Sequence, residues 1–422
     1  MKAISSALIA CAVGLGARAS SAEAQTETVL YSFCNSGVSG GCTDGAFPYA
    51  GLTDLNGVLY GTTYWGGTGI RDCDGALSLA CGTVFSFDPQ TGAETMVYSL
   101  CSLKSRRDRI CIDGKEPESG VIDVNGTLYG TSEWGGRYGY GTVFALDPAN
   151  GAETVLYSFS DKHRDYEYGA FPNADLIDVN GLLYGTTPFG GRRGGAGTAF
   201  SLDPATGIET VLHTFSAKHG DGRGPQAGMI DANGMLYGTT EYGGKHGYGT
   251  VFSLDPTTAG EPVVYSFKGY PSDGAGPVAG LLDINGMLYG TTESGGRHFA
   301  GMVFSLNPTT GAETVLYSFK GYPSDGAEPV AGLVSVDGLL YGTTEDGGRG
   351  KCYTEGGDYV GCGTVFSVDP QTGAETVQYS FSEKNNDGRF PEAGLIDVSG
   401  TLYGTTEEGG AHGYGTVFSI LP

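Results

Sequence analysis

One four-residue phrase, Tyr-Gly-Thr followed by Thr or Ser, recurs seven times along the 422-residue chain. Successive copies lie 52 to 69 residues apart, among short strand-like segments. Such a repeat is typical of radial or stacked proteins, in which each unit buries its apolar surface against the next. It therefore restricts the architecture much more than the activity. The copies start at Tyr60, Tyr129, Tyr184, Tyr237, Tyr289, Tyr341 and Tyr403.

Each repeat contains four segments that are predicted to be β-strands. In the fourth copy they are residues 227–233, 235–240, 249–255 and 261–267. The first two flank Asn-Gly, and six of the seven copies have Asn-Gly or Asp-Gly there, as a type I′ hairpin turn requires. Asp-Pro-x-Thr-Gly or a close variant supplies a second turn between the last two segments. No 3.6-residue apolar period is sustained, so we expect almost no helix.

Apolar runs such as Thr-Val-Phe-Ser-Leu predict strands that are buried on both faces. Small four-stranded sheets stacked face to face around an axis bury strands in this way. We therefore predict an all-β fold, a seven-bladed β-propeller of four-stranded antiparallel blades in a single domain, residues 25–422. Residues 27–33 resemble a fourth strand without its first three, whereas the chain ends after a third strand, residues 415–421. The N-terminal strand should complete the last blade and close the ring.

The wording of the repeat points to a known family. Leu-Tyr-Gly-Thr-Thr-Glu-x-Gly-Gly stands at residues 236–244, and Gly-x-Gly-Thr-Val-Phe-Ser-Leu-Asp-Pro follows from Gly247, with a departure at residues 259–262. This pattern resembles the bacterial GloVer tandem repeat of choice-of-anchor proteins. The resemblance implies a secreted or surface-displayed bacterial protein and supplies no catalytic residues. No C-terminal anchor is expected after the last strand.

The first 24 residues have the pattern of a secretory signal peptide. Lys2 supplies the positive charge, residues 7–16 form a short apolar run, and Ala22-Glu23-Ala24 forms an A-x-A cleavage site. Cleavage there predicts an extracellular or periplasmic protein. A lipoprotein processed at Cys11 is the alternative. No other stretch approaches the roughly 20 apolar residues of a membrane-spanning helix.

The formal net charge is −24, and it becomes −25 once the leader is removed. Nucleic acids and anionic membranes are bound by basic surfaces, so both are excluded as expected partners. The charge fits a solvated secreted surface, or ligands that are neutral, cationic or divalent metal ions. We expect a monomer without a cofactor; no motif supports a divalent cation.

Eight cysteines remain after the leader, an even number that suits an oxidising compartment. Zinc is the rival explanation, but the chain has no Cys-x-x-Cys spacing. Aligning the repeats favours four local bridges, each within one loop. The predicted pairs are Cys34–Cys42, Cys73–Cys81, Cys101–Cys111 and Cys352–Cys362.

The loops of an antiparallel blade alternate between two faces of the ring. Loops 1–2 and 3–4 share one face and are tight turns, whereas loops 2–3 and 4–1 share the other and carry most of the length variation. All four predicted bridges belong to this second, long-loop face. Insertions gathered on one face of a repeat protein usually mark its binding face. The long loops of blades 6, 7, 1 and 2 should form a raised wall there.

Charged residues recur on the same face after Tyr-Gly-Thr-Thr. The acids could form a carboxylate ring that holds cations or performs acid–base chemistry. Alternatively, the acids form ion pairs, within a loop or between blades, with the bases that recur four residues later, and the copying of both charges in most blades favours such pairs. The acids are Glu133, Glu241, Glu293, Glu345 and Glu407, and the bases are Arg137, Lys245, Arg297 and Arg349.

The residue after each acid position is not uniform. It is Trp65, Trp134, Phe189 and Tyr242 in blades 1 to 4, then Ser294, Asp346 and Glu408. Loop aromatics can stack on sugar rings or peptide side chains, or they can pack adjacent loops together. This arc, together with Glu133 and Glu241, is the predicted ligand surface. Trp65 and Trp134 should lie close together and partly exposed.

Two further patterns have weaker functional interpretations. His246, His298 and His412 share one repeat position and could hold a metal, or could be exposed loop residues. Asp-Gly-x-x-Pro recurs and indicates turns first and calcium ligands second. The Asp residues are Asp44, Asp113, Asp221, Asp273, Asp325 and Asp387, and Tyr168 interrupts the series.

The sequence contains no nucleophile elbow, His-Glu-x-x-His motif or phosphate loop, and it identifies no catalytic residue. We therefore expect a secreted binding module, for a protein or for carbohydrate of an envelope or matrix. A polysaccharide lyase or hydrolase that uses the same loop face is the first alternative, and a structural surface protein is the second.

Overall fold

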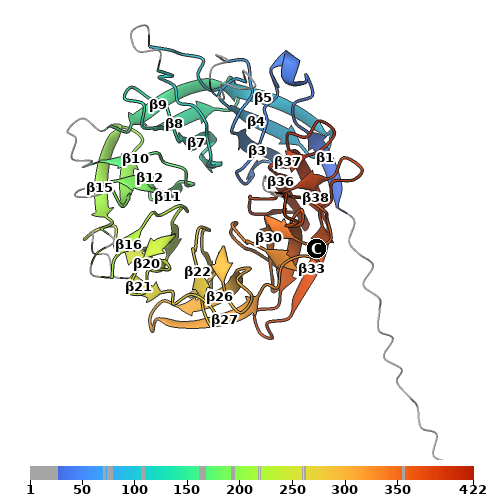
Figure 1. Ribbon diagram of the computed structural model, residues 1–422. Helices are drawn as coiled ribbons and strands as arrows, with labels where there is room; N and C mark the ends of the chain where they lie inside the picture. Colours follow the sequence, from blue (N-terminus) through green and yellow to red (C-terminus); the bar gives the residue numbers. More distant parts are fainter. Residues whose placement is uncertain are drawn as a thin grey trace, which may run out of the picture.

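A computed structural model of the chain describes residues 27–69, 73, 79–105, 110–160, 168–191, 195–216, 218, 220–258, 260, 263–353 and 357–422. These residues form seven four-stranded antiparallel sheets arranged in a ring about a central axis (Figure 1). The predicted seven-bladed β-propeller is confirmed, and the one helical element described is a short 3-10 turn, η1 (Val38–Gly40). The predicted signal peptide and Cys11 lie outside the described residues.

The blades are numbered along the chain and given from the innermost strand outward. They are β2 (Thr53–Leu55), β3 (Val58–Thr63), β4 (Thr83–Asp88) and β5 (Ala93–Ser99); β6 (Val121–Val124), β7 (Thr127–Ser132), β8 (Thr142–Asp147) and β9 (Ala152–Ser158); β11 (Ile177–Val179), β12 (Leu182–Thr187), β14 (Thr198–Asp203) and β15 (Ile208–Thr214); β17 (Ile230–Ala232), β18 (Met235–Thr240), β20 (Thr250–Leu254) and β21 (Val263–Ser266); β23 (Leu282–Ile284), β24 (Met287–Thr292), β26 (Met302–Asn307) and β27 (Ala312–Ser318); β29 (Val334–Val336), β30 (Leu339–Thr344), β32 (Thr364–Val368) and β33 (Glu375–Ser380); and β35 (Ile396–Val398), β36 (Thr401–Thr406), β38 (Thr416–Ile420) and β1 (Thr28–Ser32).

The N-terminal strand β1 closes the ring, as predicted. It pairs antiparallel with β38, in a register that places Thr28 opposite Ser419 and Ser32 opposite Thr416. The last blade therefore takes three strands from the C-terminal end of the chain and one from the N-terminal end (Figure 1).

Phenylalanine rings fill the spaces between blades. At six of the seven blade interfaces, a Phe that follows the outermost strand packs edge-to-face on a Phe of the third strand of the next blade, as Phe33 does on Phe85 at 5.0 Å. Both rings are fully buried. The apolar runs are thus buried on both faces because each sheet is sandwiched between two others.

Each of the last three positions of the recurring Tyr-Gly-Thr-Thr motif makes its own contact in the structure. A Cβ added to Gly61 would lie 2.7 Å from the ring of Phe85, so only glycine fits beside it. The next residue, Thr62, donates a hydrogen bond to the carbonyl oxygen of Ser119 in the following blade. The last, Thr63, hydrogen-bonds Thr83 on the neighbouring strand. The phrase therefore joins strands within a blade and blades to each other.

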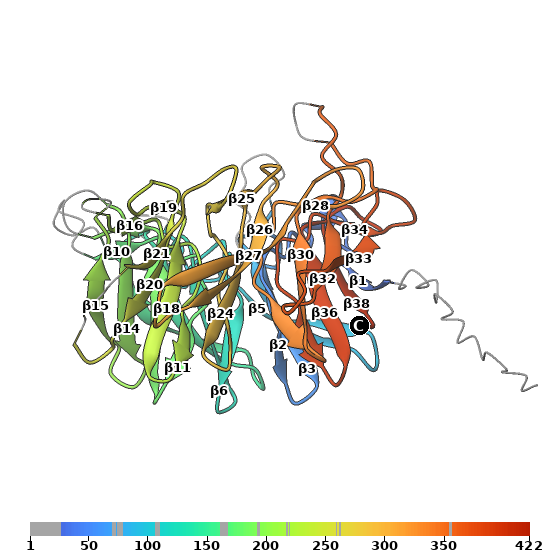
Figure 2. The same ribbon diagram turned by 90° about the horizontal axis from the view of Figure 1, so that it is seen from below.

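A feature that the sequence did not predict lies on the long-loop face. Loop 4–1 pairs with loop 2–3 through two-residue strands in blades 3 to 7 and through single bridges at Trp65 and Trp134 in blades 1 and 2. These ribbons cap one side of the ring (Figure 2). They are β10 (Gly169–Ala170) with β13 (Phe189–Gly190), β16 (Gly222–Arg223) with β19 (Tyr242–Gly243), β22 (Gly274–Ala275) with β25 (Ser294–Gly295), β28 (Gly326–Ala327) with β31 (Asp346–Gly347), and β34 (Gly388–Arg389) with β37 (Glu408–Gly409).

All four disulfides form with the predicted pairing, and all lie in loops of the long-loop face. Four bridges fit an oxidising extracellular or periplasmic compartment. Across the described residues, the search for a helix long and apolar enough to cross a membrane finds none.

Candidate functional site at the channel mouth

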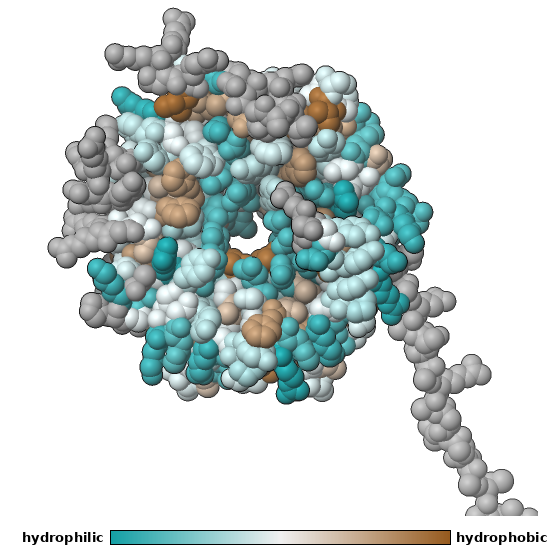
Figure 3. All heavy atoms as spheres, in the orientation of Figure 1, coloured by the Kyte–Doolittle hydropathy of each residue, from teal (hydrophilic) through white to brown (hydrophobic). Residues whose placement is uncertain are grey.

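A cavity of about 490 Å³ lies at the centre of the ring and takes its lining from all seven blades. On the long-loop face it appears as a hollow with a mostly hydrophilic wall (Figure 3). Each blade contributes the residue that follows the proline of the loop leading to its innermost strand. These channel-mouth residues are Tyr49, Glu118, Asn173, Gln226, Val278, Val330 and Glu392.

The backbone holds these side chains in place. The residue two positions before each of them has a positive φ, as at Phe47 with φ 58°, which turns the loop toward the channel. The carbonyl of the residue after each accepts a hydrogen bond from a threonine of the preceding blade at six interfaces, or, at Ala174, a longer one of 3.4 Å. The mouth is therefore built by the same contacts that hold neighbouring blades together.

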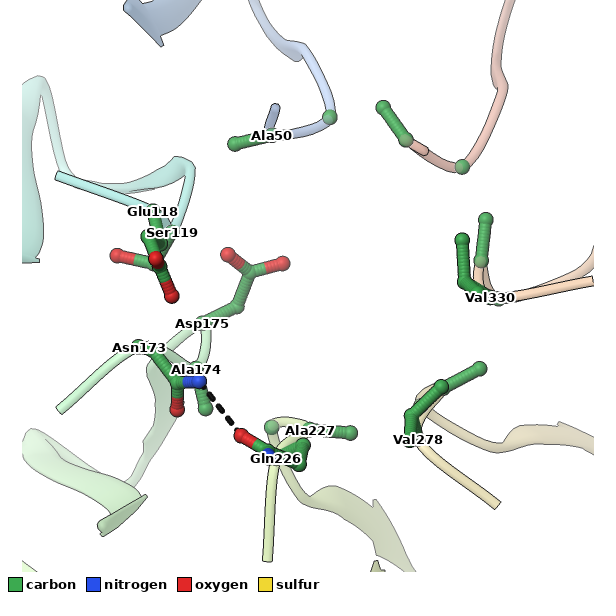
Figure 4. A pocket seen from close by; sticks show the side chains of 18 of the residues that line it. Ala50, Glu118, Ser119, Asn173, Ala174, Asp175, Gln226, Ala227, Val278 and Val330 are labelled. Atoms are coloured by element: carbon green, nitrogen blue, oxygen red, sulfur yellow. Dashed lines mark hydrogen bonds between the residues drawn. The ribbon is translucent and has the colours of Figure 1, made fainter. Parts of the chain in front are cut away.

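A chain of hydrogen bonds joins the mouth residues of blades 3 and 4. Glu118 lies beside Asn173 and beside the carboxyl group of Glu133, whose pKa its charge raises. Asn173 Nδ2 donates to Gln226 Oε1 at 2.6 Å (Figure 4), and Gln226 Nε2 donates to Glu241 Oε2 at 2.9 Å. The predicted ligand residue Glu241 thus forms one end of this chain, and Glu133, a second predicted ligand residue, lies beside Glu118 in blade 2.

A second polar group occupies blades 7 and 1. The hydroxyl of Tyr49 donates to Glu407 Oε1 at 2.9 Å, and Glu407 lies beside Glu392. The ring of Tyr49 packs edge-to-face on Tyr64 at 5.3 Å. Two carboxyl pairs, Glu118–Glu133 and Glu392–Glu407, therefore belong to blades on either side of the Tyr pair of blade 1.

The opposite arc of the mouth is apolar. Val278 and Val330 from blades 5 and 6 face the polar arc across the cavity (Figure 4). Asp175 points into the cavity from blade 3, at a position that is Gly in the other six blades, and its Oδ1 accepts the backbone N–H of Gly120 at 2.7 Å. The cavity thus offers carboxyl, amide and hydroxyl groups on one side and aliphatic groups on the other.

The carboxyl groups of the mouth have raised pKa values. Burial, followed by the neighbouring charge of Glu118, raises the pKa of Glu133 to about 8. Burial and the charges of Glu345 and Glu407 raise the pKa of Glu392 to about 9. Burial also raises the pKa of Glu118 and of Glu407. At neutral pH each pair therefore retains a proton and can both donate and accept hydrogen bonds.

The predicted ion pairs on this face do not form. Among the described residues, no contact within 4.0 Å joins any recurring Glu to the base four residues later. Two glycines with positive φ, such as Gly135 and Gly136, separate acid from base. They carry the base to the outer strand, where the amide of Arg137 bonds Ser158 Oγ at 3.2 Å. The acids remain at the centre, where Glu345, for example, lies in the field of Glu293 and Glu407.

Three aromatic residues of the predicted arc are exposed, whereas the fourth, Trp65, is half-buried. Trp134, Phe189 and Tyr242 are 37%, 54% and 50% exposed. Trp65 is half-buried and packs on Phe47 at 5.3 Å, beside the Cys34–Cys42 bridge, and its indole N–H finds no acceptor among the described residues. No ring contact between the two indoles appears among the described residues, because Trp134 packs on Phe171 of the next blade at 4.4 Å.

Exposed aromatic side chains are confined to the long-loop face. Every Trp, Tyr or Phe that is exposed among the described residues lies on a 2–3 or 4–1 loop. The tight-turn face has none in the same described set. Beyond the predicted arc, the structure adds Tyr168, Tyr248, Tyr270, Phe299, Tyr322, Tyr353 and Tyr359.

The remaining candidates have structural explanations. His246, His298 and His412 are exposed on separate blades, and across the described residues the only potential metal ligands that cluster are Cys81, Cys101 and Cys111, which are disulfide-bonded. The recurring Asp residues fix turns, as predicted. Asp273, for example, accepts hydrogen bonds from Tyr265 Oη at 2.8 Å and from the Lys268 amide at 2.9 Å.

Sequence reasoning missed the channel-mouth residues. Their loop was interpreted as turn chemistry, although the position after its proline reads Tyr, Glu, Asn, Gln, Val, Val and Glu in successive blades. Such variation within a regular repeat was the signal that selected the aromatic arc. The same test applied to this position identifies the mouth.

The fold and the site together define the class of this protein, a seven-bladed β-propeller with a ligand-sized pocket at the mouth of its channel. Within that class, the chain belongs to the Gloeobacter/Verrucomicrobia repeat family, whose model matches residues 80–283 and 272–422. The resemblance found in the repeat wording is thus confirmed. No curated protein matches the sequence.

Solved structures resemble the chain in fold. The extracellular domain of a putative one-component system from B. thetaiotaomicron has a TM-score of 0.51 at 12% identity, over 94% of this chain and 42% of that one. An oligogalacturonate lyase from Vibrio parahaemolyticus has a TM-score of 0.46 at 10% identity, over 89% of both chains. A chain of a nidogen/laminin complex has a TM-score of 0.41 at 13% identity, over 70% of this chain and 89% of that one. The first supports the propeller fold, and the other two are too distant to argue from.

Proposed function

We propose that the protein is a secreted binding module that takes an uncharged saccharide at the channel mouth. The observation that carries the proposal is the two-sided lining of the 490 Å³ cavity, polar from Glu118 through Asn173 to Gln226 and aliphatic at Val278 and Val330. A sugar ring has the same division, with hydroxyl groups at its edge and C–H groups on its faces. Pockets of about 300–1,000 Å³ with a few fixed polar groups are typical small-molecule sites.

The charge of the mouth selects among saccharides. Glu118 and Glu392 line the mouth, and further carboxyl groups lie close to these two, so a uronic acid polymer would meet like charge. The neighbouring groups are Glu116, Glu133, Glu345 and Glu407. Each carboxyl pair holds one proton at neutral pH and can bond a neutral hydroxyl as donor or acceptor. The predicted residues Trp134, Phe189 and Tyr242 lie on the same face and would extend the contact outward.

A glycan array with the mature chain tests this proposal. We expect binding to neutral oligosaccharides and none to polygalacturonate or other polyuronates. An Asn173→Ala variant should lose binding because it interrupts the hydrogen-bond chain, whereas Ile208→Ala on the tight-turn face should not change it. Binding confined to uronate polymers, or unchanged in Asn173→Ala, contradicts the proposal.

Glycoside hydrolysis at the same site is the second candidate, and one observation favours it. Burial and the charges of Glu345 and Glu407 raise the pKa of Glu392 to about 9, so Glu392 keeps its proton at neutral pH, as a general acid requires. Incubation with a bound oligosaccharide and measurement of new reducing ends separates the two functions. Release of reducing ends that stops in Glu392→Gln supports hydrolysis, and saturable binding without release supports the binding module.

A further inference from the structure

Two loops on the rim of the long-loop face carry the same seven residues, Lys-Gly-Tyr-Pro-Ser-Asp-Gly, into blades 5 and 6. The base of each loop is fixed. Asp325 Oδ2 accepts the hydroxyl of Tyr317 at 2.7 Å and the amide of Lys320 at 2.9 Å, and Asp273 makes the equivalent bonds in the other loop. A fixed loop therefore presents one tyrosine, Tyr270 or Tyr322, at its tip.

Each of these tyrosines stacks on an aromatic ring of the neighbouring 2–3 loop. Tyr270 lies parallel to Phe299, with ring centroids 3.6 Å apart and planes inclined by 13°. Tyr322 lies within 8° of parallel to Tyr359, with centroids 6.1 Å apart, and Tyr359 Oη is 2.9 Å from Tyr353 Oη. These five residues are called the rim platforms below.

The two platforms use different means to reach the same arrangement. Blade 5 supplies Phe299 from a short loop, whereas blade 6 supplies Tyr353 and Tyr359 from a longer loop closed by the Cys352–Cys362 bridge. The disulfide therefore constrains the segment that carries the two tyrosines. The bridge thus closes the loop that presents exposed aromatic residues, which a bridge that only stabilised the core would not need to do.

The rim platforms remain exposed to solvent. Tyr270 is 49% and Phe299 is 59% exposed, although each ring already covers one face of the other. The ring of Tyr248 from blade 4 approaches the same loop at Gly269 and is also exposed. Exposed flat aromatic rings held in place by stacking are available to stack on a ligand.

We propose that the rim platforms are outer subsites for an uncharged polysaccharide chain that ends in the channel-mouth pocket, an inference that rests on the proposed function. Flat aromatic surfaces repeated from blade to blade suit a ligand that itself repeats, and β-linked pyranose rings with equatorial hydroxyls present flat C–H faces to them. A protein partner would instead require one contiguous apolar core, whereas these platforms occupy separate blades. The net charge of −24 selects against polyanions.

Chain length provides the test. We would titrate the mature protein with cellobiose, cellohexaose, chitobiose and chitohexaose by calorimetry. In at least one series the six-unit ligand should bind about ten-fold more tightly than the two-unit ligand, since stacking on a second platform adds contacts. In Tyr270→Ala/Phe299→Ala that advantage should fall to about two-fold or less, with affinity for the two-unit ligand unchanged. Ile208→Ala on the opposite face is the matched control.

The outcomes separate this inference from the function on which it rests. If no oligosaccharide binds, the saccharide function itself is wrong. If two-unit ligands bind but six-unit ligands gain nothing, or the double variant keeps the full gain, the pocket stands and the rim subsites are wrong. Tyr322→Ala is a second variant in case the double substitution lowers the melting temperature, and it should also reduce the length advantage.

Discussion

Two sets of buried carboxyl groups occupy this propeller, and they differ in how they repeat. The first set lies between blades, where a tyrosine of an outermost strand bonds the Asp of the following loop and lies beside a Glu of the next blade. Tyr31 Oη, for example, lies 2.8 Å from Asp44 and 3.3 Å from Glu94. The second set lies at the channel mouth, where the chemical type changes from blade to blade.

The way in which the two sets repeat distinguishes structural from functional acids in a repeat protein. Burial raises pKa values in both sets, to about 7 at Glu94 and Glu313 between blades and to about 8 at Glu133 at the mouth. A raised pKa alone therefore does not identify a site. The interblade carboxyl clusters recur with a tyrosine at six of the seven interfaces, as the packing of similar units requires, and with His213 beside Asp221 at the other. The mouth varies, and a recognition surface must vary to fit one ligand.

Removing β1 should have the largest effect, because this strand completes blade 7 and supplies Tyr31 and Glu27 to two interblade clusters. Deleting residues 27–33 removes the fully buried Phe33 together with Val29 and Tyr31, and should cost at least about 5 kcal/mol. The exposed edge of β38 should promote aggregation. Thermal unfolding and size-exclusion chromatography measure both effects against the chain that starts at residue 25. An unchanged melting temperature would show that the ring does not depend on this strand.

The second largest effect on stability should come from a change of pH. The folded protein holds protons on Glu94, Glu153, Glu209, Glu313 and Glu375 with pKa values of about 7 to 8, compared with 4.5 ordinarily. Their contribution is complete below about pH 4.5 and is lost as the pH rises to about 8, at roughly 1 kcal/mol per group after allowance for solvent screening. The melting temperature should therefore fall from pH 5 to pH 9.

Glutamine variants sharpen this prediction, because Gln mimics the protonated acid. Glu313→Gln should match the wild type at pH 5, exceed its melting temperature at pH 9, and leave ligand affinity unchanged. Glu133→Gln should show the same gain in stability with a loss of affinity. If Glu313→Gln weakens binding, or if neither variant flattens the pH profile, the distinction between the two sets of acids is wrong.

Substitutions of the two tryptophans should differ in the same way, one affecting mainly ligand affinity and the other mainly stability. Trp134→Ala should weaken saccharide binding by about 1–3 kcal/mol and should lower the melting temperature less than Trp65→Ala does, because Trp134 is 37% exposed and loses mainly its contact with Phe171. Trp65→Ala should lower the melting temperature and leave affinity nearly unchanged, because Trp65 packs on Phe47 and beside a disulfide. Calorimetric titration and thermal unfolding of both variants provide the comparison. Equal effects of both substitutions on affinity would restore Trp65 to the ligand surface.

Removing one disulfide should have the smallest effect on stability. Cys352→Ser/Cys362→Ser should cost less than the roughly 2–5 kcal/mol typical of small disulfide scaffolds, because the propeller has its own core. The same variant should lose part of the chain-length advantage, since its loop carries Tyr353 and Tyr359. Cys34→Ser/Cys42→Ser is the control, and it should leave binding unchanged. A large loss of stability in the blade 6 variant would assign that bridge to the fold.

The sequence predicts the parts of this molecule that repeat. Asn-Gly turns, apolar runs and the half-blades at the two ends are enough to predict the strands, the seven blades and their closure. Alignment of the loops predicts the disulfides. The sequence could not predict the direction in which the loop residues point. Two glycines turn Arg137 away from Glu133, and the φ of 58° at Phe47 turns Tyr49 into the channel. The two-residue ribbons were missed because a pair of residues carries no periodicity.

Asn173→Ala and Tyr265→Phe should differ most clearly in their effects on ligand affinity and on stability. The first interrupts the hydrogen-bond chain at the mouth, and the second removes the hydroxyl that bonds Asp273 and lies 3.3 Å from Glu313 between blades. Titration of both variants with a neutral oligosaccharide, with melting temperatures measured in parallel, compares the two sets of polar groups. We predict at least a ten-fold loss of affinity at constant stability in Asn173→Ala, and about 1–3 kcal/mol lower stability at constant affinity in Tyr265→Phe. Unchanged affinity in Asn173→Ala, or an equal loss in both variants, would contradict the assignment of the channel mouth as the binding site.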